Sequence, residues 1–352
     1  MRILQVITDT DRRGAQVFAC DLGEALERKG HSVTTVALAP GSQRPGLSVD
    51  TLGASRRGLA TLRHLRRRMG DVDITIAHGS ATLLACAVAG RPFVYRQISD
   101  TRFWAAGWRR RPRVAAYLRR ARHVVALSAG AATALHEHLW LPVSRITVVP
   151  NAVPTAGFHA VGDTERAEAR TALGLATDEF VALYIGALVP EKGVDLAIRA
   201  IASTTNARLM VAGGGSQELE LQQLAQRLGA PVTFLGVLRD ARAAYRATDL
   251  NVLPSRGGDS MPATLIEAGM CGLPSIATPI GSIEDVVLHD RTGFIVPVDD
   301  VDALTARIVE LRNNPERRRQ LGEAARAHCV AHFDIDVVAA QWIQVLERVT
   351  KR

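Results

Sequence analysis

Short apolar segments alternate with helical segments along this 352-residue chain, and this alternation constrains its fold more than any other feature. We expect strands at 2–7, 32–38, 73–77, 92–96, 123–127 and 146–149, and again at 180–186, 207–212, 232–235, 249–253, 274–277 and 294–296. The intervening segments Gln16–Arg28, Ala129–Leu139, Val194–Ala202 and Gln217–Leu228 have the apolar spacing of helices. Such alternation favours parallel sheets covered on both faces, so the sequence predicts two doubly wound α/β domains.

The length and composition agree with two soluble domains. Residues 151–162 contain Pro154, Gly157 and Gly162 without clear periodicity, which is typical of a linker. No apolar run approaches the roughly 20 residues that a membrane helix needs, and the first apolar stretch is too short for a signal peptide. The four cysteines are scattered, as expected for buried thiols in a reducing compartment. We therefore expect a cytoplasmic protein.

The excess of basic over acidic residues is confined to the first half of the chain. Residues 1–150 hold 23 Arg and Lys against 10 Asp and Glu, whereas the remainder holds 20 against 25. This asymmetry suggests an anionic partner or membrane surface on that side. Leu59, Leu62, Leu65 and Met69 form an apolar stripe among arginines, which fits either a helix docked on anionic lipid or a core-facing helix with a solvated basic face. Nucleic acid is disfavoured because no recognition motif accompanies the charge.

The segment Leu253–Pro297 carries the most informative polar pattern. Asp259 and Glu267 lie eight residues apart, and Ser260-Met261-Pro262 opens a predicted helix with Pro262 at its first position. The free amides and positive end of that helix suit an anion such as a diphosphate. Glu267 lies about a turn and a half further on, where its carboxylate is expected to accept hydrogen bonds from ribose hydroxyls. A core ion pair is the alternative. The segment therefore predicts a nucleotide diphosphate site.

The order of motifs resembles that of the retaining family-4 glycosyltransferases of the GT-B fold, over nearly the whole chain. The matching segments are Val149-Pro150-Asn151-Ala152-Val153, Gly186-Ala187-Leu188, Glu191-Lys192-Gly193, Ala212-Gly213-Gly214-Gly215, Phe234-Leu235-Gly236, Thr248-Asp249-Leu250, Pro254-Ser255 before Asp259 and Glu267, Gly281-Ser282-Ile283-Glu284-Asp285 and Thr292-Gly293-Phe294. The resemblance implies two Rossmann-like domains facing each other across a cleft. The acceptor domain would span 1–153, completed by a C-terminal helix at 334–352, and the donor domain 154–333.

The resemblance also implies the site. It makes Lys192, Asp259 and Glu267 the catalytic residues. The expected donor contacts are Gly14, Gly186, Ala187, Lys192, Gly213, Leu238, Asp259, Ser260, Met261, Pro262, Ala263, Thr264 and Glu267. Lys192 is one of three lysines among 43 basic residues, and a compact ammonium before a glycine is a typical phosphate contact. A solvated lysine at a helix start is the alternative.

Several positions depart from the family pattern. Ala187 stands where an arginine often completes a diphosphate clamp, so that Arg256, Arg239 or Arg96 would have to replace it. Asp259 is one methylene shorter than the usual glutamate, and its alternative is a plain turn residue.

The candidates for the acceptor or the reacting sugar lie in the first half of the chain. Arg13 occupies the place of the first glycine in the loop Asp9–Gly14, which is otherwise a plain strand–helix turn. The usual histidine after the fourth strand is missing, and Arg96 or Gln97 takes its place. His78 is a further candidate, against a hydrogen-bonded structural histidine.

We expect a retaining, metal-independent hexosyltransferase that moves a sugar from a nucleotide diphosphate sugar, with UDP or GDP as the nucleotide and no cofactor. The acceptor is a glycan or lipid-linked molecule of cell-envelope or polysaccharide synthesis, and the enzyme sits in the cytoplasm or peripherally at the inner membrane face. The alternatives are a non-catalytic sugar-nucleotide or glycan-binding homologue and an epimerase. A dinucleotide dehydrogenase is disfavoured because no GxGxxG follows the first strand.

Overall fold

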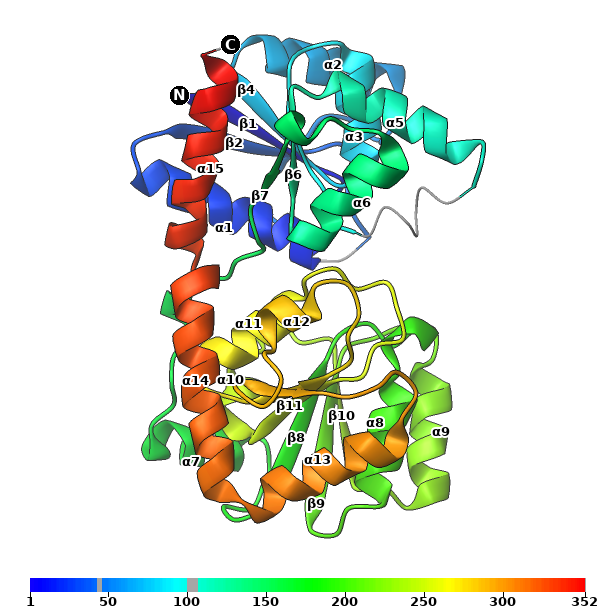
Figure 1. Ribbon diagram of the computed structural model, residues 1–352, viewed down its shortest axis with the longest axis vertical. Coiled ribbons are helices and arrows are strands. Elements are labelled where there is room, and N and C mark those ends of the chain that lie inside the picture. The colour runs from blue at the N-terminus through cyan, green and yellow to red at the C-terminus, as the bar shows by residue number, and fades with distance from the viewer. Residues whose placement is uncertain (43–45, 100–106, 352) are drawn as a thin grey trace. The chain divides into compact units, whose positions relative to one another are not determined.

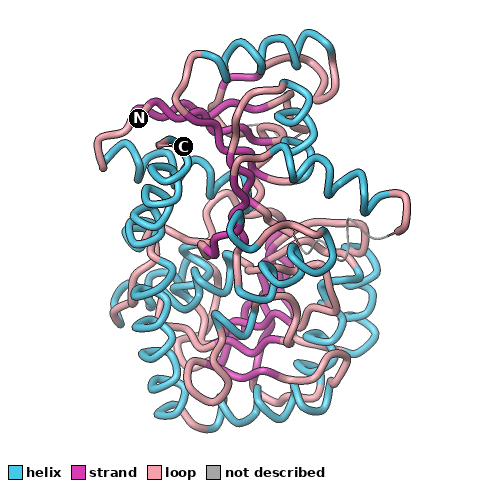
Figure 2. The backbone as a smooth tube through the Cα atoms, turned by 45° about the horizontal axis from the view of Figure 1, so that its top comes forward, coloured by secondary structure: helices cyan, strands magenta, loops and turns pink. Residues whose placement is uncertain are grey.

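The computed structural model describes residues 1–42, 46–99 and 107–351, and its chain forms two compact units (Figures 1 and 2). Unit 1 comprises Met1–Val153 and Asp334–Arg352, and unit 2 comprises Pro154–Phe333. Each unit holds one parallel sheet with helices on its faces, which is the predicted α/β fold class.

Unit 1 contains seven strands among its described residues, in the order β3-β2-β1-β4-β5-β6-β7. The strands are β1 Arg2–Ile7, β2 Ser32–Ala37, β3 Asp50–Thr51, β4 Ile74–His78, β5 Val94–Arg96, β6 His123–Ala126 and β7 Ile146–Val148. The helices are α1 Gly14–Arg28, α2 Leu59–Gly70, α3 Ser80–Ala89, α5 Arg110–Arg120, α6 Ala129–Leu139 and α15 Ile335–Thr350. The strand order reverses between β1 and β4, which places a ligand-binding position at their carboxyl ends.

Helix α15 belongs to unit 1 although unit 2 separates it from the rest of that unit in sequence. Figure 1 shows it beside α1. The Ile335 amide donates to the Val153 carbonyl at 3.1 Å, and Trp342 and Val338 are fully buried in one core cluster with Phe18. Burying these side chains holds the segment on the first part of the chain.

The apolar stripe of α2 faces the core. Leu65 and Met69 are buried among the residues of the sheet and α3, while Leu59 alone of the stripe is mostly exposed. This burial favours the core-facing interpretation of α2 over a helix lying in a membrane surface. In the part of the chain that the structure describes, no helix combines the length and apolar character needed to cross a membrane.

Unit 2 contains six strands among its described residues, in the order β10-β9-β8-β11-β12-β13. The strands are β8 Phe180–Ile185, β9 Ala207–Ala212, β10 Val232–Gly236, β11 Leu250–Leu253, β12 Ser275–Ala277 and β13 Gly293–Ile295. The helices are α7 Asp163–Ala172, α8 Val194–Ala202, α9 Glu218–Leu228, α10 Arg242–Ala247, α11 Ala263–Met270, α12 Ile283–Val286, α13 Val301–Asn313 and α14 Pro315–Phe333. Here the order reverses between β8 and β11.

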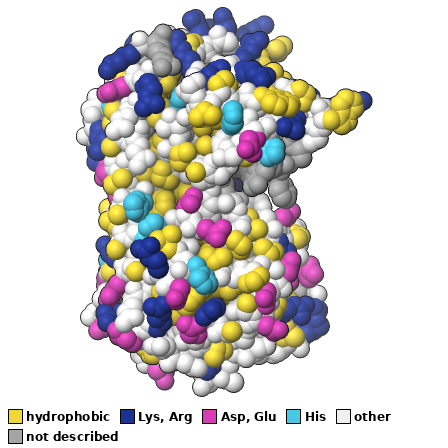
Figure 3. Space-filling model, in the orientation of Figure 1, with side chains coloured by type: hydrophobic (Ala, Val, Ile, Leu, Met, Phe, Trp, Pro, Cys, Tyr) yellow, Lys and Arg dark blue, Asp and Glu magenta, His cyan; other side chains and the backbone are white. Residues whose placement is uncertain are grey.

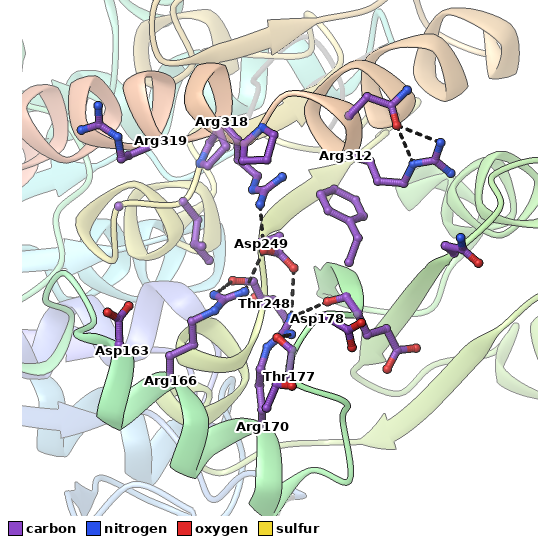
Figure 4. Close-up of a pocket in the computed structure, with 18 residues that line it drawn as sticks. Asp163, Arg166, Arg170, Thr177, Asp178, Thr248, Asp249, Arg312, Arg318 and Arg319 are labelled. Carbon is purple, nitrogen blue, oxygen red and sulfur yellow. Dashed lines mark hydrogen bonds and ion pairs between the residues drawn. The ribbon is translucent and has the colours of Figure 1, made fainter.

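An ion-pair cluster fixes the start of β11. Asp249 is 8% exposed and pairs with Arg166 at 2.7 Å, Arg170 at 3.0 Å and Arg318 at 3.6 Å (Figure 4). It also accepts a hydrogen bond from the Val181 amide at 2.9 Å, and so joins β11 to β8. The cluster borders a cavity of about 780 Å³ at the amino-terminal edge of the sheet. It anchors the two strands whose opposite ends carry the predicted donor residues.

Candidate functional site

The donor residues predicted in unit 2 meet at the carboxyl edge of its sheet. Gly186, Ala187 and Lys192 follow β8, whereas Asp259 and Glu267 follow β11. These are the two strands between which the strand order reverses, and open α/β sheets bind ligands at that position.

Glycines bring the loops after β8 and β9 into direct backbone contact. A Cβ at Gly213 would lie 1.8 Å from the carbonyl oxygen of Gly186, and Gly213 has φ +142°. The Gly213 amide donates to the Gly236 carbonyl at 2.8 Å, which ties in the loop that holds half-buried Leu238. The Ala187 methyl is exposed and its carbonyl accepts a hydrogen bond from Tyr184. Backbone groups and small side chains therefore line this part of the site.

Lys192 and Asp259 form an ion pair. The second oxygen of Asp259 accepts a hydrogen bond from the Ser255 hydroxyl, and the carboxylate is 7% exposed. Lys192 lies in a short 3₁₀ turn, Pro190–Lys192. Gly193 follows it at φ +62°, and a Cβ there would also clash with the Pro254 carbonyl, so both the backbone conformation and the space require glycine. Both side chains are thus positioned by buried partners, and Asp259 is more than a turn residue.

Helix α11 begins one residue later than we predicted. Pro262 has φ −63° and ψ 126° and is the N-cap, so the prediction that it occupies the first helical position is wrong. The Pro262 ring supplies no capping side chain, and the Ala263 and Thr264 amides open the first turn. Met261 is buried, while Ser260 and Thr264 are half-buried at the same edge. The free amides at this helix start still suit an anion in this register.

Glu267 has a protein partner that the sequence did not reveal. The Tyr245 hydroxyl donates to its Oε2 at 2.8 Å, and the same hydroxyl lies 3.2 Å from the Thr264 carbonyl. Burial, then the charge of Glu267, raises the pKa of Tyr245 well above its usual range. The phenol therefore remains a donor that orients the half-buried carboxylate.

Arg256, one of the arginines expected to replace the missing clamp cation, is held by two carboxylates of unit 2. Its guanidinium bonds Asp195 at 2.6 and 2.9 Å and Asp299 at 2.5 Å. Hydrogen bonds to Asp195 and Asp299 raise the pKa of Arg256 above its usual value. Arg239 is exposed in the loop after β10, and Arg96 belongs to unit 1. Of the two candidate arginines in unit 2, Arg239 is therefore a better replacement than Arg256 for the arginine that is missing at Ala187.

Two predicted residues of unit 1, Arg13 and His78, meet at the carboxyl ends of β1 and β4, whereas Arg96 and Gln97 lie at the end of β5 and do not line the same cavity. Asp9, Arg13, Gln16 and His78 line a cavity of about 210 Å³. Asp9 is almost fully buried, accepts hydrogen bonds from Gln16 at 2.9 Å and pairs with Arg56. A Cβ at Gly14 would meet no atom within 4 Å, so α1 begins with open space above its first turn.

His78 offers a hydrogen-bond acceptor to this cavity wall. Its Nε2 donates to the Gln5 Oε1 at 2.9 Å, which leaves Nδ1 as an unprotonated acceptor without a partner among the described residues. Burial, and secondarily the charge of Arg96, lowers the pKa of His78 well below 6.5. The imidazole is therefore neutral in the folded protein at neutral pH.

This lowered pKa makes the folded state sensitive to acid. Because unfolded His78 binds its proton near pH 6.5 while the folded form does not, its contribution to stability is complete above that pH and is lost as the pH falls. We expect His78→Gln to remove up to about 1.4 kcal/mol per pH unit from the slope of the free energy of unfolding between about pH 6.5 and 5. Urea unfolding at several pH values measures this slope, with exposed His138→Gln as the matched control. An unchanged slope in His78→Gln would contradict the prediction.

Arg96 is a buried cation without a carboxylate partner in the part of the chain that the structure describes. It is 1% exposed, donates to the Asn151 Oδ1 at 2.8 Å and stacks 3.5 Å from the Phe18 ring centre. Its Nε and Nη1 have no partner among the described residues, and burial lowers the pKa of Arg96 to about 9. Gln97 is also buried, and its Nε2 donates to the Ser99 carbonyl at 3.1 Å. An unpaired buried guanidinium suits an anionic ligand.

Three functional features escaped the sequence analysis. They are the Tyr245 partner of Glu267, the Ser255 partner of Asp259 and the pair between buried Asp9 and exposed Arg56. Each joins residues whose contact depends on the fold, although Ser255 already stood in the Pro-Ser motif. Among the described residues, no group of three or more His, Cys, Asp or Glu side chains is arranged to hold a metal ion.

Two family models match consecutive parts of the chain. Residues 165–328 match the model of "Glycosyl transferases group 1" and residues 12–156 match "Glycosyltransferase Family 4". A GDP-mannose-dependent alpha-(1-6)-phosphatidylinositol monomannoside mannosyltransferase of Mycolicibacterium smegmatis is 29% identical over 78% of this chain and 80% of its own length. A GDP-mannose-dependent monoacylated alpha-(1-6)-phosphatidylinositol monomannoside mannosyltransferase of Corynebacterium glutamicum is 31% identical over 56% of this chain, and the match spans only 55% of that relative. The crystal structure of Anabaena Alr3699/HepE in complex with UDP-glucose superposes with a TM-score of 0.88 at 21% identity, over 99% of this chain and all of that one.

Proposed function

The chain belongs to the family-4 glycosyltransferases and has the GT-B fold, and we propose that it transfers a hexose, with retention and without a metal ion, from a UDP- or GDP-sugar to a lipid-linked acceptor of cell-envelope synthesis. One observation carries the proposal. Lys192, Asp259, Glu267 and the uncapped start of α11 meet where the strand order of unit 2 reverses.

The proposed donor site follows from the chemistry of these groups. The diphosphate accepts hydrogen bonds from the Ala263 and Thr264 amides and faces the ammonium of Lys192, which neutralises the charge of the leaving group. Glu267, held by Tyr245, accepts hydrogen bonds from the ribose hydroxyls. When the donor binds, the Asp259 oxygen that contacts Lys192 accepts a hydrogen bond from a hydroxyl of the donor sugar instead. The loop after β10 supplies backbone contacts to the base.

In unit 1, the cavity beside Asp9 and His78 is proposed to hold the acceptor hydroxyl and the reacting sugar. The Nδ1 of His78 and the Oε1 of Gln97 accept hydrogen bonds from sugar hydroxyls, and Arg13 and Arg96 supply donors. We propose transfer on one face of the sugar, with the leaving diphosphate assisting deprotonation of the acceptor. The acceptor class follows from the two mannosyltransferases that act on phosphatidylinositol glycolipids and from the charge of residues 1–150. Such an enzyme works in the cytoplasm or peripherally at the inner membrane face.

A non-catalytic nucleotide-sugar-binding homologue is the second candidate. Two observations favour it: Ala187 supplies no clamp cation, and Arg256 is bound to Asp195 and Asp299. A binding protein would still show nucleotide affinity but no release of nucleotide from the donor.

Nucleotide release from UDP-, GDP-, ADP- and dTDP-sugars, with and without extracted lipid acceptors, tests the proposal. We expect one nucleotide to be released, and Glu267→Gln to raise the KM for that donor by about 10²-fold or more through weakened ribose contacts. Tyr245→Phe is the matched variant, because it removes the orienting phenol while keeping the carboxylate, and a smaller rise is expected. Tight nucleotide binding with no release under any condition would instead support the binding homologue.

A further inference from the structure

A cavity of about 610 Å³ lies in unit 1 between α2, α3 and α5. Its wall contains four arginines, Arg56, Arg57, Arg110 and Arg113, and no carboxylate among the described residues that line it. The larger cavity beside Asp249 differs, because its five arginines face four carboxylates. Of these two cavities, the α2–α3–α5 cavity is therefore the one whose described wall is cationic without compensating carboxylates. Figure 3 shows Lys and Arg side chains gathered over unit 1 on the face that it draws.

Most of these arginines are available to a ligand. Arg56 pairs with Asp9, but Arg57, Arg110 and Arg113 form no ion pair or side-chain hydrogen bond with any residue that the structure describes. The first turn of α3 adds to the positive wall, because Ser80 lines the cavity and no side chain caps this helix start. A guanidinium group can bind two oxygens of one phosphate at the same time. Three free arginines beside a helix start therefore suit a phosphate ester.

The remaining wall is apolar. Leu62, Leu84 and Val114 are half-buried along it, and Val88 is 55% exposed. A small phosphate, a sugar phosphate or a nucleotide would leave this apolar surface in water. An alkyl chain attached to the phosphate would cover it and gain the free energy of burial. The wall therefore matches a molecule with an anionic head and an apolar chain.

We propose that the α2–α3–α5 cavity binds the acceptor lipid by its phosphate and the first part of its alkyl chains. The arginines of α5 and of the loop before α2 hold the phosphate, and Val88, Leu84 and Val114 contact the chain. The inference rests on the proposed function, because only a transferase has an acceptor. It also goes beyond it, since it assigns the lipid to a cavity that none of the predicted site residues lines.

Binding of short-chain phosphatidic acid to the full-length protein, without any donor, tests the proposal. The double variant Arg110→Ala/Arg113→Ala is expected to weaken binding about tenfold or more, since it removes two charge-assisted contacts. The matched control, Arg63→Ala/Arg67→Ala, removes the same charge from exposed positions of α2 outside the cavity and should change binding less than about twofold. Val88→Glu places a carboxylate at an exposed position of the apolar wall, and should also weaken binding without disturbing the core. Phosphatidylcholine vesicles with and without phosphatidic acid repeat the comparison on a membrane.

Equal losses in the two double variants would overturn the proposal, because general charge attraction would then explain binding. Inorganic phosphate binding as tightly as the lipid would also overturn it, since the apolar wall would contribute nothing. The proposed function fails in a different way: the lipid still binds, with the same variant pattern, while no nucleotide sugar is turned over. If both hold, Arg110→Ala/Arg113→Ala raises the KM for the lipid acceptor and leaves the KM for the donor unchanged.

Discussion

Replacing Lys192 by methionine is expected to lower kcat for sugar transfer by about 10²–10³-fold, with a much smaller change in the KM for the donor. The reason is that the ammonium neutralises charge that develops on the leaving diphosphate during bond cleavage, whereas ribose and base contacts hold the ground state. Methionine replaces the apolar stem of lysine almost atom for atom and lacks only the ammonium, so the turn Pro190–Lys192 is expected to be preserved. Steady-state kinetics measures both kcat and the KM for the donor, with the nucleotide sugar that the release experiment identifies.

The ion pair with Asp259 requires a control, because Lys192→Met leaves a nearly buried carboxylate bonded to Ser255. The double variant Lys192→Met/Asp259→Asn removes that charge. Recovery of kcat in the double variant would show that the unpaired carboxylate caused the loss, and would contradict the proposed role of Lys192. A kcat that stays well below that of the single variant Asp259→Asn supports it, because that variant lacks the same carboxylate but keeps Lys192. Lys192→Arg should recover part of the activity, since it restores the charge with a different geometry.

Asp249→Asn is expected to destabilise unit 2 by about 3–5 kcal/mol. The carboxylate faces Arg166, Arg170 and Arg318, and its loss leaves three guanidinium groups together, of which Arg170 has a side chain only 2% exposed. Urea unfolding followed by circular dichroism measures the change. Asp178→Asn is the matched control, because Asp178 borders the same cavity but is exposed. A loss below about 1 kcal/mol in Asp249→Asn would show that the cluster is dispensable.

Much of the fold follows from local sequence patterns. The predicted strands 2–7 and 207–212 and the predicted helices Ala129–Leu139 and Val194–Ala202 coincide with β1, β9, α6 and α8. Apolar periodicity identifies these elements because each buries one face or both in the core. Strand β3, Asp50–Thr51, was missed, since two exposed polar residues produce no apolar run and pair with β2 only through the backbone.

In the candidate site, too, some features follow from the sequence and others do not. The positions of Lys192, Asp259 and Glu267 at the ends of β8 and β11 follow from the order of motifs and the topology of parallel sheets. Their partners do not, because the Lys192–Asp259 contact spans 67 residues and the Tyr245–Glu267 contact spans 22. No local spacing rule relates residues so far apart in sequence. The predicted start of α11 at Pro262 was wrong for a local reason. Proline favours the first helical turn, but that preference does not distinguish the first helical position from the N-cap.

The discontinuity of unit 1 determines when each unit can be completed during synthesis on the ribosome. Unit 2 is one continuous stretch, so all of its strands have emerged before α15 is translated. Unit 1 lacks Ile335, Val338 and Trp342 until that point, and the surface of α1 that they cover stays in contact with water or a chaperone. The half of the chain translated first is therefore completed second.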